Sequence, residues 1–206
     1  MSRIVIAFVL VLLLVLTTSA PAVSGPATGD VNAFWGLGVG VAGTDGRLAA
    51  QFSGGGGLRL RLGFRVGRLG AELQIAATGI ASKLDGESAF MYAYRPAATF
   101  YVIKARMFQL LGHAGLGFGA ISSSRSVQVP CAPPEECATK LGEQGLSYPG
   151  VSLDAGVTAQ VHLGRDKSHA MLWLDFGGSF TRHQIEGVPT TGGIHELTLG
   201  IANAFN

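Results

Sequence analysis

Five histidines are the side chains of this sequence best suited to acid–base chemistry: His113, His162, His169, His183 and His195. A serine-type hydrolase needs a histidine beside a serine hydroxyl and a carboxylate. Only His183, Ser179 and Glu196 are close enough in the expected fold to be considered for that role. The other histidines lack a serine and a carboxylate at a matching depth on a neighbouring strand. A hydrogen-bonding role is therefore favoured, and no catalytic, cofactor or metal residue is assigned.

Cys131 and Cys137 are the two cysteines of the chain, and they flank the segment Ala-Pro-Pro-Glu-Glu. Two nearby cysteines in an exported protein favour a disulfide. A metal site would need further ligands, and no histidine lies next to this pair. We expect an intraloop disulfide at the tip of the longest loop, residues 122–148.

The N-terminus has the three parts of an export signal. Arg3 precedes an apolar core from Ile4 to Leu16, and Ala20-Pro21-Ala22 supplies a small-x-small cleavage pattern. The core is shorter than the roughly 20 residues of a spanning helix, so a cleaved signal is favoured over a retained anchor. We expect a signal peptide at 1–22, a short segment at 23–30 and one domain at 31–206.

The composition excludes nucleic-acid binding and fits a membrane protein. The formal net charge is only +2, which gives no basic surface for nucleic acid. Charged residues make up 14% of the chain, and the mean hydropathy is +0.37. A soluble domain would be about one quarter charged. The glycine runs at 36–40 and 54–57 are not phosphate loops, because no Lys-Ser/Thr follows them.

Eight segments alternate between apolar and small or polar residues, which is the period of a β-strand. In one of them Leu58, Leu60 and Leu62 alternate with Arg59 and Arg61. The segments lie near 31–43, 58–66, 69–76, 90–102, 108–118, 151–162, 172–181 and 196–205. Short turns at 67–68, 104–106 and 164–168 alternate with longer loops. This alternation predicts an up-and-down barrel with a tight-turn rim and a loop rim, and with both termini at the tight-turn rim.

Two Asp-Gly pairs predict tight hairpins at the loop rim. Asp85-Gly86 would pair Ala81 with Phe90, and Asp45-Gly46 would pair Val39 with Phe52. Both hairpins keep the apolar residues of neighbouring strands on one face. A register slip by one residue would put them on opposite faces.

Aromatic residues near both strand ends predict that the apolar face meets lipid. Phe64, Phe100, Phe108 and Phe205 lie toward the tight-turn rim, and Phe52, Phe90, Tyr92, Phe118 and Phe180 lie toward the loop rim. Two aromatic girdles around an aliphatic band are typical of a membrane barrel. A soluble lipocalin-like barrel would instead point its apolar face inward.

An eight-stranded barrel is just wide enough to be filled by side chains. Eight charged residues are expected to face inward: Arg59, Arg61, Arg65, Arg95, Glu72, Asp154, Asp175 and Glu196. Four are basic and four acidic, which predicts a paired network because buried charges need partners. Glu72 should lie diagonal to Arg61 and Arg65. A filled lumen disfavours a diffusion pore.

The last segment contains Thr198, Gly200 and Phe205, which are similar to the assembly signal of outer-membrane barrels. Over about residues 30–206 the chain resembles the small OmpA transmembrane-domain and OmpX-like class. The resemblance implies an all-β, eight-stranded antiparallel up-and-down transmembrane β-barrel after a cleaved N-terminal signal peptide. It also implies a bacterial outer-membrane location with periplasmic termini, and contacts with outer-membrane lipids and with the barrel-assembly machinery.

Function is then expected on the loops. The leading hypothesis is a structural or adhesive surface protein without a cofactor, which binds an unidentified extracellular ligand through the 122–148 loop. The alternatives are a lipid-modifying enzyme and a barrel that binds small solutes or lipids.

Overall fold

The computed structural model describes residues 31–83, 88–105, 107–128, 141–163, 170–185 and 187–205. The expected signal peptide at 1–22, the segment 23–30 and both cysteines lie outside the described residues. The predicted disulfide and cleavage site therefore stay predictions.

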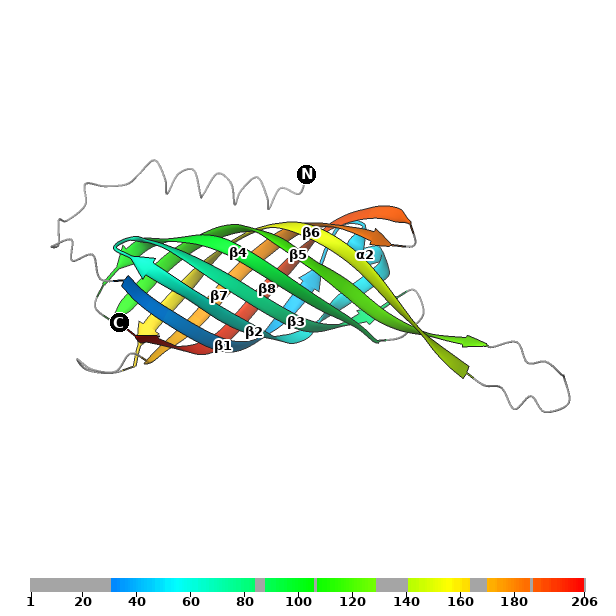
Figure 1. Ribbon diagram of the computed structural model, residues 1–206, viewed down its shortest axis with the longest axis horizontal. Coiled ribbons are helices and arrows are strands. Elements are labelled where there is room, and N and C mark those ends of the chain that lie inside the picture. Colours follow the sequence, from blue (N-terminus) through cyan, green and yellow to red (C-terminus); the bar gives the residue numbers. More distant parts are fainter. Residues whose placement is uncertain are drawn as a thin grey trace, which may run out of the picture.

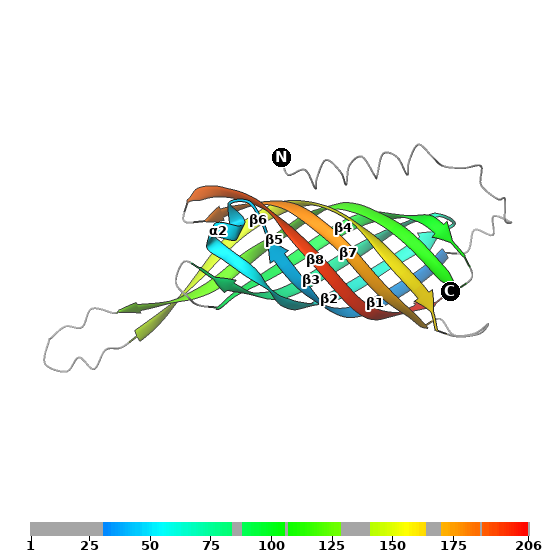
Figure 2. The same ribbon diagram turned by 180° about the vertical axis from the view of Figure 1, so that it is seen from behind.

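Eight antiparallel strands form a closed barrel, as the sequence predicted (Figures 1 and 2). The strands are β1 (Val31–Thr44), β2 (Phe52–Val66), β3 (Leu69–Ser82), β4 (Ser88–Lys104), β5 (Phe108–Gln128), β6 (Leu141–His162), β7 (Ala170–Ile185) and β8 (Val188–Phe205). Each strand pairs with its neighbours in sequence, and β8 closes the barrel on β1, with Ala33 opposite Phe205. The start of β1 and the end of β8 therefore lie at one rim, together with the tight turn at Gly67 and Arg68.

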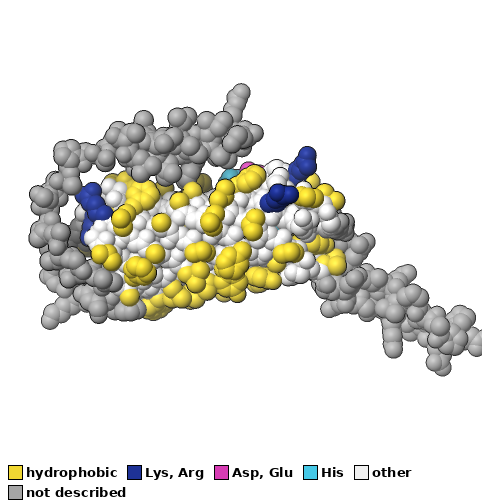
Figure 3. Space-filling view, turned by 45° about the horizontal axis from the view of Figure 1, so that its top comes forward, with side chains coloured by type: hydrophobic (Ala, Val, Ile, Leu, Met, Phe, Trp, Pro, Cys, Tyr) yellow, Lys and Arg dark blue, Asp and Glu magenta, His cyan; other side chains and the backbone are white. Residues whose placement is uncertain are grey.

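The alternation of the sequence separates an apolar exterior from a polar interior. Val39, Leu116 and Leu153 on the outer face are each more than 60% exposed. Figure 3 shows hydrophobic side chains spread over the barrel wall, with Lys and Arg side chains near its two ends. Among the described residues, no helix is long and apolar enough to cross a membrane.

A four-residue helix, α2 (Leu48–Gln51), follows β1 at the loop rim, where the sequence predicted a tight hairpin. Val39 therefore faces Leu58 instead of Phe52. The pairing between β2 and β3 also shifts between Phe52 and Gly55. This irregularity turns Phe52 into the interior, where it is fully buried, so its predicted place in the outer girdle is wrong.

The hairpin predicted at Asp85-Gly86 has a different register. Phe90 faces Gly79 and not Ala81. The offset is two residues, so every side chain keeps its predicted face. Phe90 accordingly remains on the exterior, where it is half exposed.

The segment expected as a loop at 122–148 is largely a β-hairpin. β5 runs to Gln128 and β6 begins at Leu141, and these two residues face each other in the last pair. Pairing continues because the backbone groups that face each other across the ribbon bond to one another without help from β4 or β7. In Figures 1 and 2 this ribbon extends beyond the barrel.

Candidate functional site

All eight charged residues predicted to face inward are buried in the lumen. Their positions follow from strand parity, since each alternates with outward-facing apolar neighbours. Three strands meet at Glu196 of β8, which accepts hydrogen bonds from Arg59 of β2 and Arg95 of β4. Arg59 also donates to Asp175 at 2.5 Å, and Arg95 lies 3.3 Å from Asp154. The arrangement gives each of these buried charges an opposite charge.

A second centre lies around Glu72. Arg61 Nη2 donates to both carboxylate oxygens, at 2.9 and 2.7 Å, and Gln74 donates to one of them at 2.6 Å. Arg61 also donates to Thr158 at 3.1 Å, and its guanidinium lies 5.0 Å from the centre of the Trp173 ring. Glu72 thus holds Arg61, the diagonal partner that the sequence predicted.

Asp175 connects the two centres through residues that the charge pattern did not single out. Its Oδ1 accepts a hydrogen bond from Thr158 at 2.5 Å and lies 3.0 Å from Nε2 of His113. Nδ1 of His113 is 3.5 Å from the amide nitrogen of Gln74. Strand parity explains why Thr158 and His113 lie inside, but their partners depend on how strands far apart in sequence meet across the lumen.

Arg65 is not paired with Glu72, contrary to the sequence-based expectation. Its Nη1 donates to Tyr101 Oη at 3.1 Å and to Gln160 Oε1 at 2.9 Å. Its guanidinium also stacks on Phe34, 4.2 Å from the ring centre. Glu72 lies opposite Gly63 and binds Arg61. Its carboxylate therefore does not bridge Arg61 and Arg65.

Glycines in β1 and β8 provide the space for Trp173. A Cβ on Gly38 would lie 2.7 Å from the indole ring, and one on Gly200 would lie 2.6 Å from it. Both distances are well inside van der Waals contact. The high glycine content of these strands therefore serves the packing of one large lumen side chain.

The side chains considered for hydrolysis, His183, Ser179 and Glu196, do not form a hydrogen-bonded triad. His183 Nδ1 lies 3.1 Å from the carbonyl oxygen of Tyr148, and Ser179 Oγ has no hydrogen-bond partner. Glu196 is engaged by two arginines. His195 instead pairs with Asp45 at 2.9 Å at the loop rim. His169 lies outside the described residues, and the described residues contain no cluster that could hold a metal ion.

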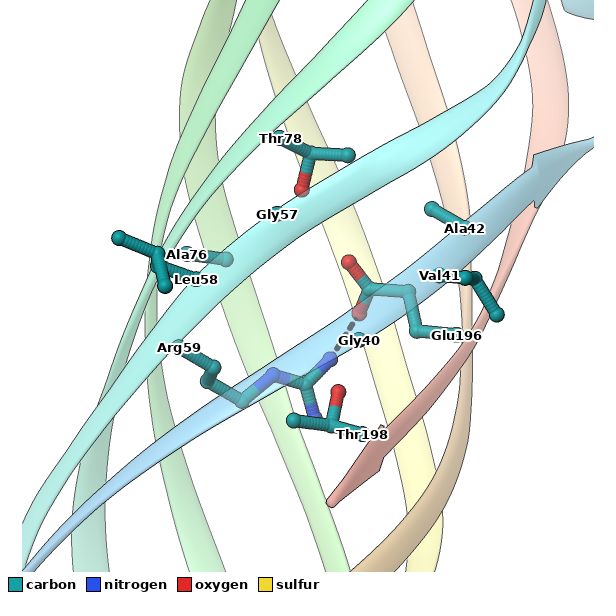
Figure 4. Close-up of a pocket in the computed structure, with 10 residues that line it drawn as sticks. All are labelled: Gly40, Val41, Ala42, Gly57, Leu58, Arg59, Ala76, Thr78, Glu196 and Thr198. Atoms are coloured by element: carbon teal, nitrogen blue, oxygen red, sulfur yellow. Dashed lines mark hydrogen bonds and ion pairs between the residues drawn. The ribbon is translucent and has the colours of Figure 1, made fainter. Parts of the chain in front are cut away.

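Two small internal cavities lie among the described residues of the lumen. A cavity of about 10 Å³ lies beside the ion pair of Arg59 and Glu196, with Thr78 and Thr198 on its wall (Figure 4). Another, of about 20 Å³, is bordered by Ser179 and His183. These volumes are near what one water molecule requires. Neither would admit a metabolite.

The loop end of the lumen is filled by apolar side chains. Leu48 of α2 and Phe52 of β2 are fully buried there against Ile121. The other members of this apolar plug are Ala42, Ile80, Ala89, Met91, Tyr148, Ile185 and Ile194. The lumen therefore has an apolar end and a charged middle.

Comparison with solved structures identifies the fold. The chain is similar to Neisserial surface protein A, with 12% identity over 85% of this chain and 97% of that one and a TM-score of 0.50. It is also similar to a major outer membrane protein of Thermus thermophilus, with 14% identity over 84% of this chain and 99% of that one and a TM-score of 0.55.

No family model matches the chain, and no curated protein matches it in sequence. The likeness thus rests on strand number, closure and up-and-down order. It agrees with the resemblance suggested by the alternating segments. The chain has the fold of the small eight-stranded outer-membrane β-barrels.

Proposed function

We propose that this protein resides in the bacterial outer membrane, with its termini on the periplasmic side, and acts as a surface-interaction protein. The barrel serves as the anchor, and the ribbon of β5 and β6 serves as the contact element. The disulfide predicted between Cys131 and Cys137 would close the tip of this ribbon.

The observation that carries the proposal is the reach of this ribbon. β4 stops pairing with β5 at Ser123, and β7 stops pairing with β6 at Gly150. β5 and β6 continue together for five further pairs, from Ser124 with Gly145 to Gln128 with Leu141. At about 3.3 Å per residue, five pairs extend roughly 17 Å past the last partner on β4. A ribbon that stands clear of its barrel is suited to contact another molecule.

The filled lumen supports this role over transport. The charged middle and the apolar plug occupy the interior, and the cavities described above hold about one water each. A diffusion channel needs a continuous path, and eight strands leave an interior that side chains fill. The ribbon is a feature of the described structure that neither anchoring nor packing explains.

The test removes the ribbon and keeps the barrel. Ser123 directly faces Leu146, so residues 124–145 can be replaced by Asn-Gly as a two-residue hairpin turn. Heat-modifiable gel migration should show that the shortened barrel still folds. Cells displaying it should attach to a serum-protein-coated surface no better than cells without the gene.

A matched variant replaces only residues 129–140 and leaves the paired ribbon. Loss of attachment in both variants would assign contact to the tip, and loss in the longer deletion alone would assign it to the paired strands. Full attachment of both folded variants would overturn the proposal. Ion conductance of the wild-type barrel in planar bilayers would favour a channel, and altered lipid A in mass spectra would favour an enzyme.

A further inference from the structure

Arg65 differs from the three other arginines of the lumen. Arg59, Arg61 and Arg95 each contact at least one carboxylate. Within the described part of the chain, Arg65 forms no ion pair. Arg65 is nevertheless buried, with only 5% of its surface exposed. A guanidinium is charged at any physiological pH, and burying it without a counter-ion is costly.

The unused atoms of Arg65 form one edge of its guanidinium. Nη1 is held by Tyr101 and Gln160. Nε and Nη2 are buried and have no hydrogen-bond partner. These two nitrogens point their hydrogens in the same direction, and this is an edge that grips an oxyanion through two parallel hydrogen bonds.

Arg61 Nε also has no hydrogen bond, but Nη2 of the same guanidinium binds Glu72. Arg95 Nε lies 3.3 Å from Asp154, and Nη1 of Arg95 binds Glu196. Arg65 therefore combines a free edge with an uncompensated charge. A water molecule could accept its hydrogen bonds but would not neutralise it. An anion would do both.

The surroundings of Arg65 are also cationic. Arg65 lies on β2 two residues before the tight turn that contains Arg68. Lys104 Nζ is 5.2 Å from the centre of the Tyr101 ring, and the Arg65 guanidinium is 5.4 Å from the same centre. No carboxylate of the described side chains balances this rim, because Glu72 is held by Arg61 and Gln74. Arg65, Arg68 and Lys104 have no described carboxylate to balance their charges. This end of the lumen therefore favours the binding of an anion that carries more than one negative charge.

We propose that the tight-turn end of the lumen is a binding site for a phosphate group, which Arg65 holds through Nε and Nη2. Tyr101 and Gln160 position the guanidinium, and Phe34 supports its face. Arg68 and Lys104 add long-range attraction from the rim. The phosphate can come from inorganic phosphate or from a phospholipid headgroup, and the shared chemistry is the tetrahedral oxyanion.

The direct test observes the Nε–H group by nitrogen-15 NMR. The chain is refolded in alkyl maltoside micelles, which contain no phosphate, and sodium phosphate replaces sodium chloride at constant ionic strength. The Arg65 Nε–H resonance should shift and saturate, while those of Arg59, Arg61 and Arg95 should stay in place. An Arg65 resonance that does not move would overturn the proposal, and this result needs no variant to fold.

Substitutions then separate the bidentate contact from general attraction. Arg65→Lys keeps the charge but removes the paired donors, so phosphate affinity by calorimetry should fall about tenfold, the equivalent of one charge-assisted hydrogen bond. Arg68→Gln removes a rim charge and leaves the Arg65 edge intact, so the change should be about twofold. Equal losses in the two variants would indicate unspecific attraction and contradict the site.

A competition experiment identifies the source of the phosphate. Short-chain phosphatidylglycerol is added to the micelles before the phosphate titration. If it shifts the same Arg65 resonance and weakens phosphate binding, the headgroup is the ligand. If inorganic phosphate alone shifts the resonance, the ligand is the free ion. Both outcomes support the site, and failure of both ligands refutes it.

Discussion

Arg61 and Arg65 lie four residues apart on the inner face of β2, yet their surroundings are opposite. Arg61 binds both oxygens of Glu72, and Arg65 binds a phenol and an amide. The charge of Arg61 is balanced by a carboxylate inside the protein. The charge of Arg65 is balanced by no carboxylate of the described side chains. Burial alone thus does not reveal what a lumen charge contributes, because its partners determine whether it stabilises the barrel or can bind a ligand.

The largest effect should come from removing the partner of Arg61. Glu72→Ala leaves a buried guanidinium without its counter-ion, and we expect it to lower the free energy of unfolding by about 3–5 kcal/mol. Urea titration of the barrel in lipid vesicles measures this. Glu72→Gln keeps the volume and some hydrogen bonding, so it should be the milder change. A loss below about 1 kcal/mol for Glu72→Ala would mean that the pair is solvated.

Disturbing the aromatic support of Arg61 should have an intermediate effect. In Gly38→Ala the new Cβ would lie 2.7 Å from Trp173, and overpacking of this kind costs about 1–3 kcal/mol. Gly43→Ala is the matched control on β1, because nothing lies within 4 Å of its Cβ. Urea midpoints and Trp173 fluorescence should both change for Gly38→Ala and remain unchanged for the control.

Removing Arg65 should cost much less than removing Glu72. In Arg65→Met the loss of two hydrogen bonds is offset by the removal of an unpaired buried charge, so we expect stability within about 1 kcal/mol of wild type. The measurement is the same urea titration in phosphate-free buffer. Destabilisation as large as that of Glu72→Ala would show that Arg65 is as fully paired as Arg61.

The smallest effect is expected at the exposed ion pair of the loop rim. The hydrogen bond from His195 lowers the pKa of Asp45, and so does the hydrogen bond from the backbone of Gly193. A lowered carboxyl pKa adds stability that is present above the ordinary value of 3.8 and is lost as the pH falls through the lowered pKa.

Asp45→Asn should therefore cost at most about 1 kcal/mol at neutral pH, because both side chains of the pair are more than one third exposed. Below the ordinary pKa of Asp45 the difference between the variant and the wild type should shrink. Unfolding curves recorded between pH 3 and pH 7 test this. A difference that does not shrink below pH 3.8 would contradict the assigned ion pair.

Strand parity explains what the sequence could predict. Period two places Arg59, Asp175 and Glu196 inside whatever the exact pairing, because register errors of two residues leave each side chain on its face. The closed barrel and the buried charges followed from that pattern. The offset beside Asp85-Gly86, which moved Phe90 from Ala81 to Gly79, changed no face.

The sequence-based predictions were wrong where the alternation of the strands is interrupted, or where strand alternation does not determine which side chains meet. α2 and the irregularity after Phe52 break the alternation at the loop rim and turn that ring inward. Whether Glu72 pairs with Arg61 or with Arg65 depends on how far the side chains reach between β2 and β3. The contact of Asp175 with His113 depends on which strands meet across the lumen, and a strand pattern read along the chain carries no such information.

The three-way meeting at Glu196 has a consequence for biogenesis. Arg59 lies on the second strand, but its two carboxylate partners, Asp175 and Glu196, lie on the last two strands. In an open sheet that still lacks β7 and β8, Arg59 has neither Asp175 nor Glu196 as a partner. Arg95 likewise lacks Glu196. The electrostatic gain therefore arrives late and favours closing the seam between β1 and β8 over lengthening an open intermediate.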